Sequence, residues 1–215
     1  MREFLHTFRS FFARHDIVLV LAFLLLFRAG EAQALKLVAP FLLDPRDKGG
    51  LGFTTADVGL VYGTIGVACL TVGGIVGGYV VSLHGLRRWL WPMVLAVHVP
   101  NLAFVYLAYA MPSSLWVVAG AIAIEQFGYG FGFAAYLLFM ILVADGPHKT
   151  AHYAICTGFM ALGMMLPGMV SGWIQERLGY EHFFIWVCLC TLPSIALTAL
   201  LRIPPAFGRK QADAA

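Results

Sequence analysis

The sequence predicts an all-α membrane protein in which six transmembrane helices form one bundle. Its composition is far more apolar than that of a soluble domain, since 60% of the 215 residues are hydrophobic and 12% are charged, against about 25% charged in soluble domains. The mean hydropathy is +0.83. The apolar residues also form long runs, and a membrane-crossing helix needs about 20 of them.

Six runs meet that length, and short polar connections separate them. They are residues 17–43, 58–83, 89–110, 116–143, 152–174 and 183–201. The chain therefore divides into a linker (1–16), a transmembrane bundle (17–202) and a polar tail (203–215).

The linker predicts a short amphipathic helix on the inner membrane face. Apolar side chains recur there at helical spacing, namely Phe4, Leu5, Phe8, Phe11 and Phe12. A cleaved signal peptide is the alternative, because residues 17–27 form an apolar core and Ala32-Gln-Ala34 has the form of a cleavage site. Arg28 and Glu31 lie between the two, and the apolar character resumes afterwards, so we expect this segment to be retained as the first span.

The first span carries three charges, Arg28, Glu31 and Lys36. A charge at the centre of a bilayer costs at least about 2.5–3.5 kcal/mol, so it normally faces a protein interior or a water-filled cavity. Arg28 and Glu31 are three residues apart and can pair on a helix. Two readings stay open: a structural ion pair, or an anion-binding Arg28 that Glu31 neutralises when no substrate is bound. Lys36, about two turns farther out, either snorkels to the outer interface or lines the mouth of a cavity.

The second and fifth spans are rich in glycine, which predicts close helix packing. The glycines are Gly63, Gly66, Gly73, Gly74, Gly77 and Gly78 in the second span, and Gly158, Gly163, Gly168 and Gly172 in the fifth. Pro167 and Pro193 predict kinks in the fifth and sixth spans.

The third and fourth spans place polar residues about midway along their length. His98 and Asn101 flank Pro100 in the third span, and Glu125, Gln126 and Tyr129 lie in the fourth. Together with Arg28 and Glu31 they predict a polar site near one plane, where alternating access requires a substrate site.

Each of these residues has a functional and a structural interpretation. A carboxyl group buried without a basic partner favours its neutral form, so Glu125 suits proton coupling, and it could equally form a hydrogen bond between helices. His98 is either a proton relay or a core histidine whose hydrogen bonds are satisfied. Gln126 and Tyr129 could bind sugar or peptide groups of a substrate, or join neighbouring helices.

Basic residues predict the orientation of the bundle. With the N-terminus inside, nine lie on the inner side: Arg2, Arg9, Arg14, Arg87, Arg88, Lys149, Arg202, Arg209 and Lys210. Three lie on the outer side: Arg46, Lys48 and Arg177. We therefore expect both termini to be cytoplasmic.

Several function classes have no support in the sequence. The net charge of +3 is too small for a nucleic-acid footprint. Cys69, Cys156, Cys188 and Cys190 form no C-x-x-C pair, so we interpret them as packing thiols. H-E-x-x-H and G-x-S-x-G are absent, and the glycines at 128–132 lie within a membrane run without the strand that precedes a phosphate loop. An enzyme, a metal site and a cofactor are therefore not expected.

A degenerate motif lies in the inner connection after the second span. Gly78-Tyr-Val-Val-Ser-Leu-His-Gly85-Leu-Arg87-Arg88 is similar to the loop signature of the major facilitator superfamily. Ser82 stands at its acidic position and Leu83 at a basic one. The resemblance implies a gating loop formed by Gly78, Gly85, Arg87 and Arg88.

Four longer strings are more specific. They are FRAGEAQALKLVAPFLLD, GLVYGTIGVACLTVGGIVGG, AIEQFGYGFGFAAYLLFMI and HYAICTGFMALGMMLPGMVSGW. They resemble the muropeptide-permease-like (AmpG-type) branch of that superfamily, and the resemblance runs over nearly the whole chain. Members of the superfamily have twelve spans in two six-span halves, and this chain resembles the second half (helices 7–12).

The resemblance implies a secondary active transporter half in a bacterial inner membrane. It would act in proton-coupled uptake (symport) of an anionic solute such as an anhydro-muropeptide, with a complementary half or a second copy as partner. In that reading Arg28, Lys36, Gln126, Tyr129 and Asn101 contact the substrate. The protons would pass through Glu31, Glu125 and His98. The alternative is a membrane scaffold, a regulator or the remnant of a truncated transporter gene, none of which transports.

Overall fold

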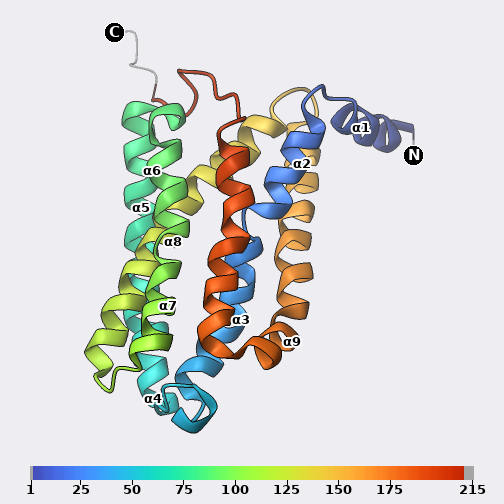
Figure 1. Ribbon diagram of the computed structural model, residues 1–215. Helices are drawn as coiled ribbons and strands as arrows, with labels where there is room; N and C mark the ends of the chain where they lie inside the picture. Colours follow the sequence, from blue (N-terminus) through green and yellow to red (C-terminus); the bar gives the residue numbers. More distant parts are fainter. Residues whose placement is uncertain (1, 211–215) are drawn as a thin grey trace.

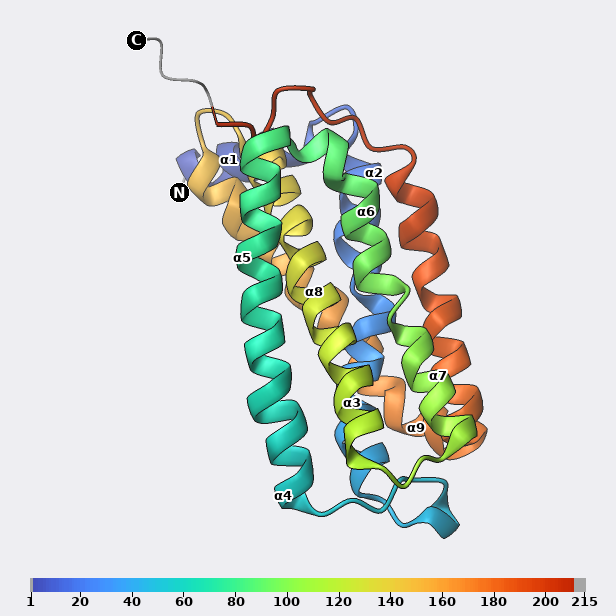
Figure 2. The same ribbon diagram turned by 90° about the vertical axis from the view of Figure 1, so that its left-hand side faces the viewer.

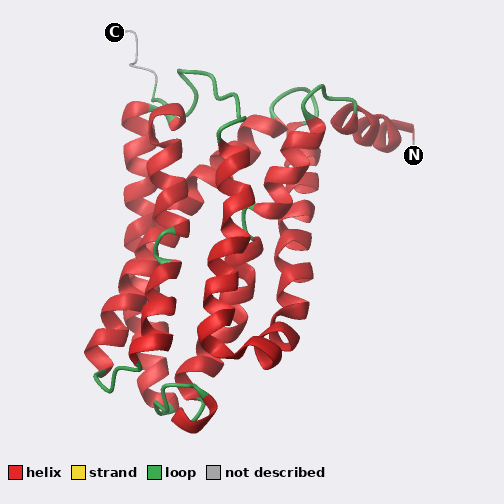
Figure 3. Cartoon of the chain, in the orientation of Figure 1, coloured by secondary structure: helices red, strands yellow, loops and turns green. Residues whose placement is uncertain are grey.

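The structure is a computed structural model that describes the backbone of residues 2–210 and the side chains of residues 7–210. Its regular structure is helical throughout that range, and the long helices run side by side as one bundle (Figure 1, Figure 3). The α-helices are α1 (Arg2–Phe12), α2 (Ile17–Leu26), α3 (Ala29–Leu43), α4 (Thr55–Val58), α5 (Val67–His84), α6 (Leu86–His98), α7 (Asn101–Ala110), α8 (Leu115–Ala144) and α9 (Lys149–Thr198). A 3-10 turn, η1 (Arg46–Lys48), and a π-helix, η2 (Gly59–Gly66), complete the order. The predicted all-α class is confirmed.

Five helical stretches of the described chain are long and apolar enough to cross a membrane, one fewer than the sequence predicts. They are Ile17–Leu43, Thr55–His84, Leu86–Ala110, Leu115–Ala144 and Lys149–Thr198. The difference lies in α9, whose 50 residues would extend over about 75 Å as a straight helix. The hydrocarbon core of a bilayer is only about 30 Å thick.

A break at Gly179 divides α9 into two shorter helical arms. Its φ of 70° and ψ of 167° lie in a region that glycine enters without steric cost. The chain folds back there, so that an orange arm (149–178) leads toward the end of the bundle where α4 lies and a red arm (180–198) leads back from it (Figure 1). The polar connection predicted between the fifth and sixth runs is thus shorter than expected, since only Gly179 leaves the helical conformation. A separate membrane crossing by each arm stays a prediction.

Three long helical stretches are interrupted near polar residues. The first stretch breaks between α2 and α3, at Phe27 and Arg28, and the third between α6 and α7, at Val99 and Pro100. The second stretch contains the π-helix η2. Backbone groups freed within a membrane helix need other partners, so such breaks are tolerated where neighbouring helices or a cavity cover them.

Two apolar clusters fill the bundle, and the polar residues lie between them. One contains Phe27 and Phe131, and the other contains Ala34 and Ile122. Arg28 and Glu31 fall between Phe27 and Ala34 along the chain. Glu125 falls between Ile122 and Phe131. The packed cores thus leave a polar layer near the start of α3 and the middle of α8.

Glycines on α8 bring neighbouring helices to backbone contact. A Cβ atom on Gly130 would overlap the Leu70 carbonyl of α5, and one on Gly128 would overlap the Ala96 carbonyl of α6. The expected small-residue packing is present, and α8 remains one helix through these glycines (Figure 2). The close approach is what allows α8 to contact several helices at once.

We expect Gly130→Ala to destabilise the protein, because the backbone of Leu70 cannot move aside cheaply. Overpacking of this kind costs about 1–3 kcal/mol. Gly120→Ala on the same helix is the matched control, since its Cβ would meet nothing within 4 Å and alanine is the better helix former. Thermal unfolding in detergent should show a lower midpoint for G130A than for G120A. Equal midpoints would contradict the packing role.

Helix α1 is present as predicted and projects sideways from one end of the bundle, beside the start of α2 (Figure 1). Phe11 is fully buried, while Phe4 and Leu5 lie outside the described side chains. His152 Nε2 lies 3.0 Å from Ser10 Oγ, and an Arg14 N–H donates to the Asp145 carbonyl at 3.0 Å. These contacts tie the linker to the start of α9. The placement of α1 on a membrane surface stays a prediction.

The two ends of the bundle differ in charge. The end that carries both termini (Figure 1) has eight basic residues and two acidic ones among residues 7–210. They are Arg9, Arg14, Arg87, Arg88, Lys149, Arg202, Arg209 and Lys210, with Asp16 and Asp145. The opposite end has three basic and five acidic residues: Arg46, Lys48 and Arg177, with Asp44, Asp47, Asp57, Glu176 and Glu181.

Candidate functional site

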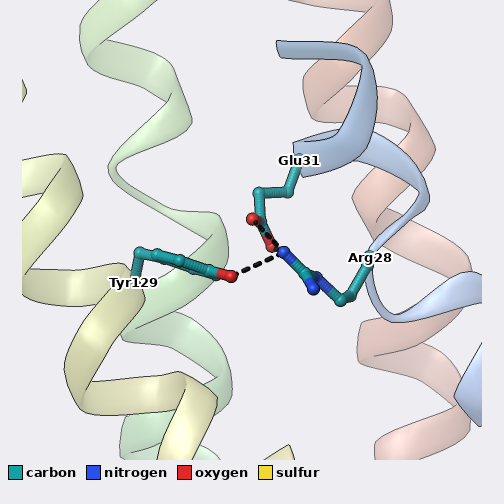
Figure 4. A network of polar contacts seen from close by, with 3 residues as sticks. All are labelled: Arg28, Glu31 and Tyr129. Carbon is teal, nitrogen blue, oxygen red and sulfur yellow. Dashed lines mark hydrogen bonds and ion pairs between the residues drawn. The ribbon is translucent and has the colours of Figure 1, made fainter. Parts of the chain in front are cut away.

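The polar layer centres on an ion pair at the break between α2 and α3. Arg28 precedes α3 and Glu31 lies in its first turn, so the helical spacing directs both side chains to one side. The Arg28 guanidinium donates to both carboxylate oxygens of Glu31, at 2.9 Å and 3.3 Å. Each residue is 5% exposed. The pair is therefore both bidentate and buried (Figure 4).

Tyr129 connects this pair to α8. An Arg28 N–H donates to the Tyr129 hydroxyl at 2.5 Å, as Figure 4 shows. The guanidinium carbon also lies 4.9 Å from the ring centre of Phe133 and 5.5 Å from that of Tyr129, within range of a cation–π interaction. Arg28 thus has a carboxylate, a hydroxyl and two aromatic rings as neighbours, a set that compensates much of its lost hydration.

Glu125 lies one turn before Tyr129 on α8 and lacks such compensation. It is 8% exposed, and its Oε2 atom has no hydrogen-bond partner in the described part of the chain. A cavity of about 20 Å³ adjoins it, and Glu31, Tyr62, Gln126 and Tyr129 also line that cavity. This volume holds about one water molecule. Two carboxyl groups, one paired and one unpaired, therefore share one small cavity.

This arrangement supports two chemical events. A carboxyl group that is buried without a cation is stable when it carries a proton, so Glu125 can hold a proton inside the bundle. A buried guanidinium whose carboxylate partner is displaced or neutralised needs another anion, so Arg28 can bind a carboxylate or phosphate. Because Glu31 and Glu125 line the same cavity, a charge on one disfavours a charge on the other.

The remaining predicted residues lie away from this cavity. His98 Nε2 is 2.8 Å from Ser194 Oγ, and the Ser194 hydroxyl donates to the Thr191 carbonyl, so the imidazole N–H is the donor to Ser194. Asn101 is buried, and its amide nitrogen has no partner among the described residues. Lys36 is exposed and lies beside Gly168 of α9. Roles for these three in transport stay predictions.

The predicted gating loop is bound by a segment that the sequence did not connect with it. Gly85 has a φ of 86°, and the next N–H, of Leu86, donates to the Phe207 carbonyl at 2.9 Å. The Lys210 N–H donates to the Ser82 carbonyl at 2.8 Å. Gly78 faces open space. The segment after α9 therefore lies against the α5–α6 connection, and gating by this loop stays a prediction.

Sequence reasoning missed two residues of the site and several bonds between helices. Tyr62 lines the cavity from η2, and Phe133 stacks on Arg28. Phe133 lies one turn after Tyr129 on α8, and this spacing in the sequence could have placed both rings on the same helix face. Trp186 donates to the Gln33 side-chain oxygen at 2.9 Å, a contact between α9 and α3 that no local pattern indicates.

Metal binding has no support in the described residues, where no group of three or more His, Cys, Asp or Glu side chains could hold an ion. The four cysteines predicted as packing thiols are free, and Cys156 is fully buried.

No protein-family model matches the chain, but single proteins do. The chain is 25% identical over 194 residues to the anhydromuropeptide permease of Escherichia coli K12, covering 90% of this chain and 38% of that protein. It is 28% identical over 190 residues to an uncharacterized protein of Haemophilus influenzae, covering 84% and 43%. It is 25% identical over 199 residues to the putative transporter AmpG 2 of Rickettsia prowazekii, covering 93% and 47%.

These comparisons confirm the resemblance to the AmpG-type branch that the four sequence strings indicated. The chain spans less than half the length of each of these relatives. Together with the apolar helices, they identify the chain as a multi-pass membrane protein that is similar to transporters.

Proposed function

We propose that the chain is one half of a proton-coupled importer for an anionic solute such as an anhydro-muropeptide. The observation that carries this proposal is the buried pair of Arg28 and Glu31 beside the unpaired Glu125. Charged residues inside membrane segments are costly and mark substrate or proton paths. The similarity to permeases supports transport as the activity, and the E. coli relative's name suggests the solute.

In this proposal Arg28 binds the anionic group of the solute, and Tyr129 and Gln126 orient it. Glu125 takes up a proton on the outer side and releases it on the inner side. Protonation of Glu31 or its displacement by the solute frees Arg28. A proton on either carboxyl group removes a negative charge near the site that the anion enters. Proton binding and solute binding therefore favour each other.

The small cavity implies that the solute site is completed by a second bundle. A volume of about 20 Å³ holds about one water molecule, and pockets for small organic ligands measure about 300–1,000 Å³. We therefore propose that a complementary half, or a second copy, closes over α3 and α8. Each arm of α9 crosses the membrane in this arrangement, which gives six crossings.

The charge difference between the ends supports the orientation. Cytoplasmic loops carry an excess of Lys and Arg, and the end with both termini is the basic one. We propose that this end faces the cytoplasm of a bacterial cell and that the protein lies in the inner membrane.

Uptake of a labelled anhydro-muropeptide tests the function. The chain would be expressed alone and beside a matching N-terminal half, in cells that lack their own permease. We expect uptake only with the partner, and its loss when the proton gradient is collapsed. No uptake in either setting, with both proteins confirmed in the membrane, would contradict this solute and favour a non-transporting scaffold, regulator or remnant.

A further inference from the structure

A second cavity lies at the basic end of the bundle, between the first turns of α6 and the coil that follows α9. Its volume is about 600 Å³, enough for a small organic ligand. Arg87 and Trp91 line it from α6, and Leu201 and Arg202 from the coil. Two arginines from different elements thus face one cleft.

These two arginines lack neutralising partners. Both are exposed, and among residues 7–210 neither takes part in an ion pair or a side-chain hydrogen bond. No carboxylate lines the cleft. This sets the cleft apart from the polar layer, where Glu31 neutralises Arg28. An arginine pair of this kind suits a phosphate group, which guanidinium binds by two parallel hydrogen bonds.

An exposed apolar track leads away from Arg87 along α6 and α7. Trp91, Leu95, Val99 and Leu102 are all exposed, and their spacing of three or four residues places them on one helix face. The red arm of α9, which lies beside α7 in Figure 2, exposes Leu189 and Leu192, and the coil after it exposes Leu200. The cleft therefore lies at the polar end of the apolar track on α6 and α7.

Trp91 indicates the depth of the cleft in a membrane. It is 42% exposed and lies one turn from Arg87 in the direction of the apolar track. Exposed tryptophans gather at the headgroup level of membranes, and basic pockets between helices on the cytoplasmic side bind anionic headgroups.

We propose that this cleft binds an anionic phospholipid from the leaflet on the side of the two termini. Arg87 and Arg202 hold the phosphodiester, and the apolar track receives the acyl chains. The same arginines could attract free phosphate, but a free ion would leave the apolar track unused. The proposal does not depend on the transported solute. It also gives Arg87 a role apart from gating.

Lipid binding to the purified full chain tests this site. Native mass spectrometry in a neutral detergent would compare phosphatidylglycerol, phosphatidylcholine and inorganic phosphate. We expect phosphatidylglycerol to bind most tightly. Each juxtamembrane arginine contributes about fivefold to such affinity, so R87Q/R202Q should bind it about twenty-five-fold more weakly.

Arg88 supplies the matched control. It neighbours Arg87 and is exposed, but it does not line the cleft. R88Q should bind phosphatidylglycerol like the unmodified chain, and R87K/R202K should retain most of the affinity. Equal weakening by R88Q and R87Q/R202Q would overturn the site, and so would unchanged binding by the double variant. Displacement of phosphatidylglycerol by inorganic phosphate at similar concentration would overturn the lipid as ligand.

Discussion

Replacement of Arg28 by alanine is expected to abolish uptake and to destabilise the bundle. The substitution leaves the Glu31 carboxylate buried without its cation, and breaking a buried ion pair in this way costs about 3–5 kcal/mol. It also removes the only guanidinium that contacts Glu31 and Tyr129 in the described structure. Uptake with the partner half should fall by at least about thirtyfold, as expected when one member of a buried charge pair is truncated.

A double substitution separates the two readings of the ion pair. Arg28→Ala combined with Glu31→Gln removes both charges, so thermal stability in detergent should recover most of the loss seen with Arg28→Ala alone. Uptake should stay absent, because the anion has lost its binding group. Arg28→Lys keeps the charge but not the bidentate geometry, and should retain the fold with weakened uptake. Uptake by R28A/E31Q at the level of the unmodified chain would show that the pair is structural.

Replacement of Glu125 by glutamine is expected to uncouple uptake from the proton gradient. Glutamine has nearly the same shape and is always neutral, so it mimics the protonated carboxyl group and cannot release a proton. Accumulation against a concentration gradient should be lost, while exchange of labelled for unlabelled solute across the membrane should continue. Stability should change little, since Glu125 makes no ion pair among the described residues.

Glu181→Gln is the control for this substitution. Glu181 is exposed at the end of the bundle opposite the termini. Its substitution by glutamine removes the same charge as E125Q, but far from the cavity. It should leave accumulation unchanged. If E125Q still accumulates solute in proportion to the proton gradient, Glu125 does not carry the coupled proton, and Glu31 becomes the candidate to test with Glu31→Gln.

Much of the fold follows from the sequence because it depends on local patterns. Apolar runs of membrane length predicted the helices, and each run is helical over most of its length in the structure. The break within α9 was predicted as a longer connection, because Glu176, Arg177 and Glu181 are polar. The structure keeps these residues helical and turns the chain at Gly179 alone, since one glycine with positive φ is enough to redirect a helix.

The sequence predicted those parts of the candidate site that depend on residue spacing within one helix. It did not predict the parts that depend on how each helix is rotated about its own axis. The pair of Arg28 and Glu31 follows from their separation of three residues. Lys36 was expected either to reach the outer interface or to line the mouth of a cavity. It lies exposed beside Gly168, and its role stays a prediction. His98 has the expected depth, yet it faces Ser194.

The sequence by itself determined that this chain is helical, resides in a membrane and carries charges at mid-depth, because composition and residue spacing act within one helix. Only the tertiary structure decided that Tyr129 contacts Arg28, that Glu125 shares a cavity with Glu31 and that Arg87 and Arg202 line one cleft. These contacts join residues far apart in the chain. They depend on how each helix is rotated about its axis, and that rotation is set by packing against the neighbouring helices.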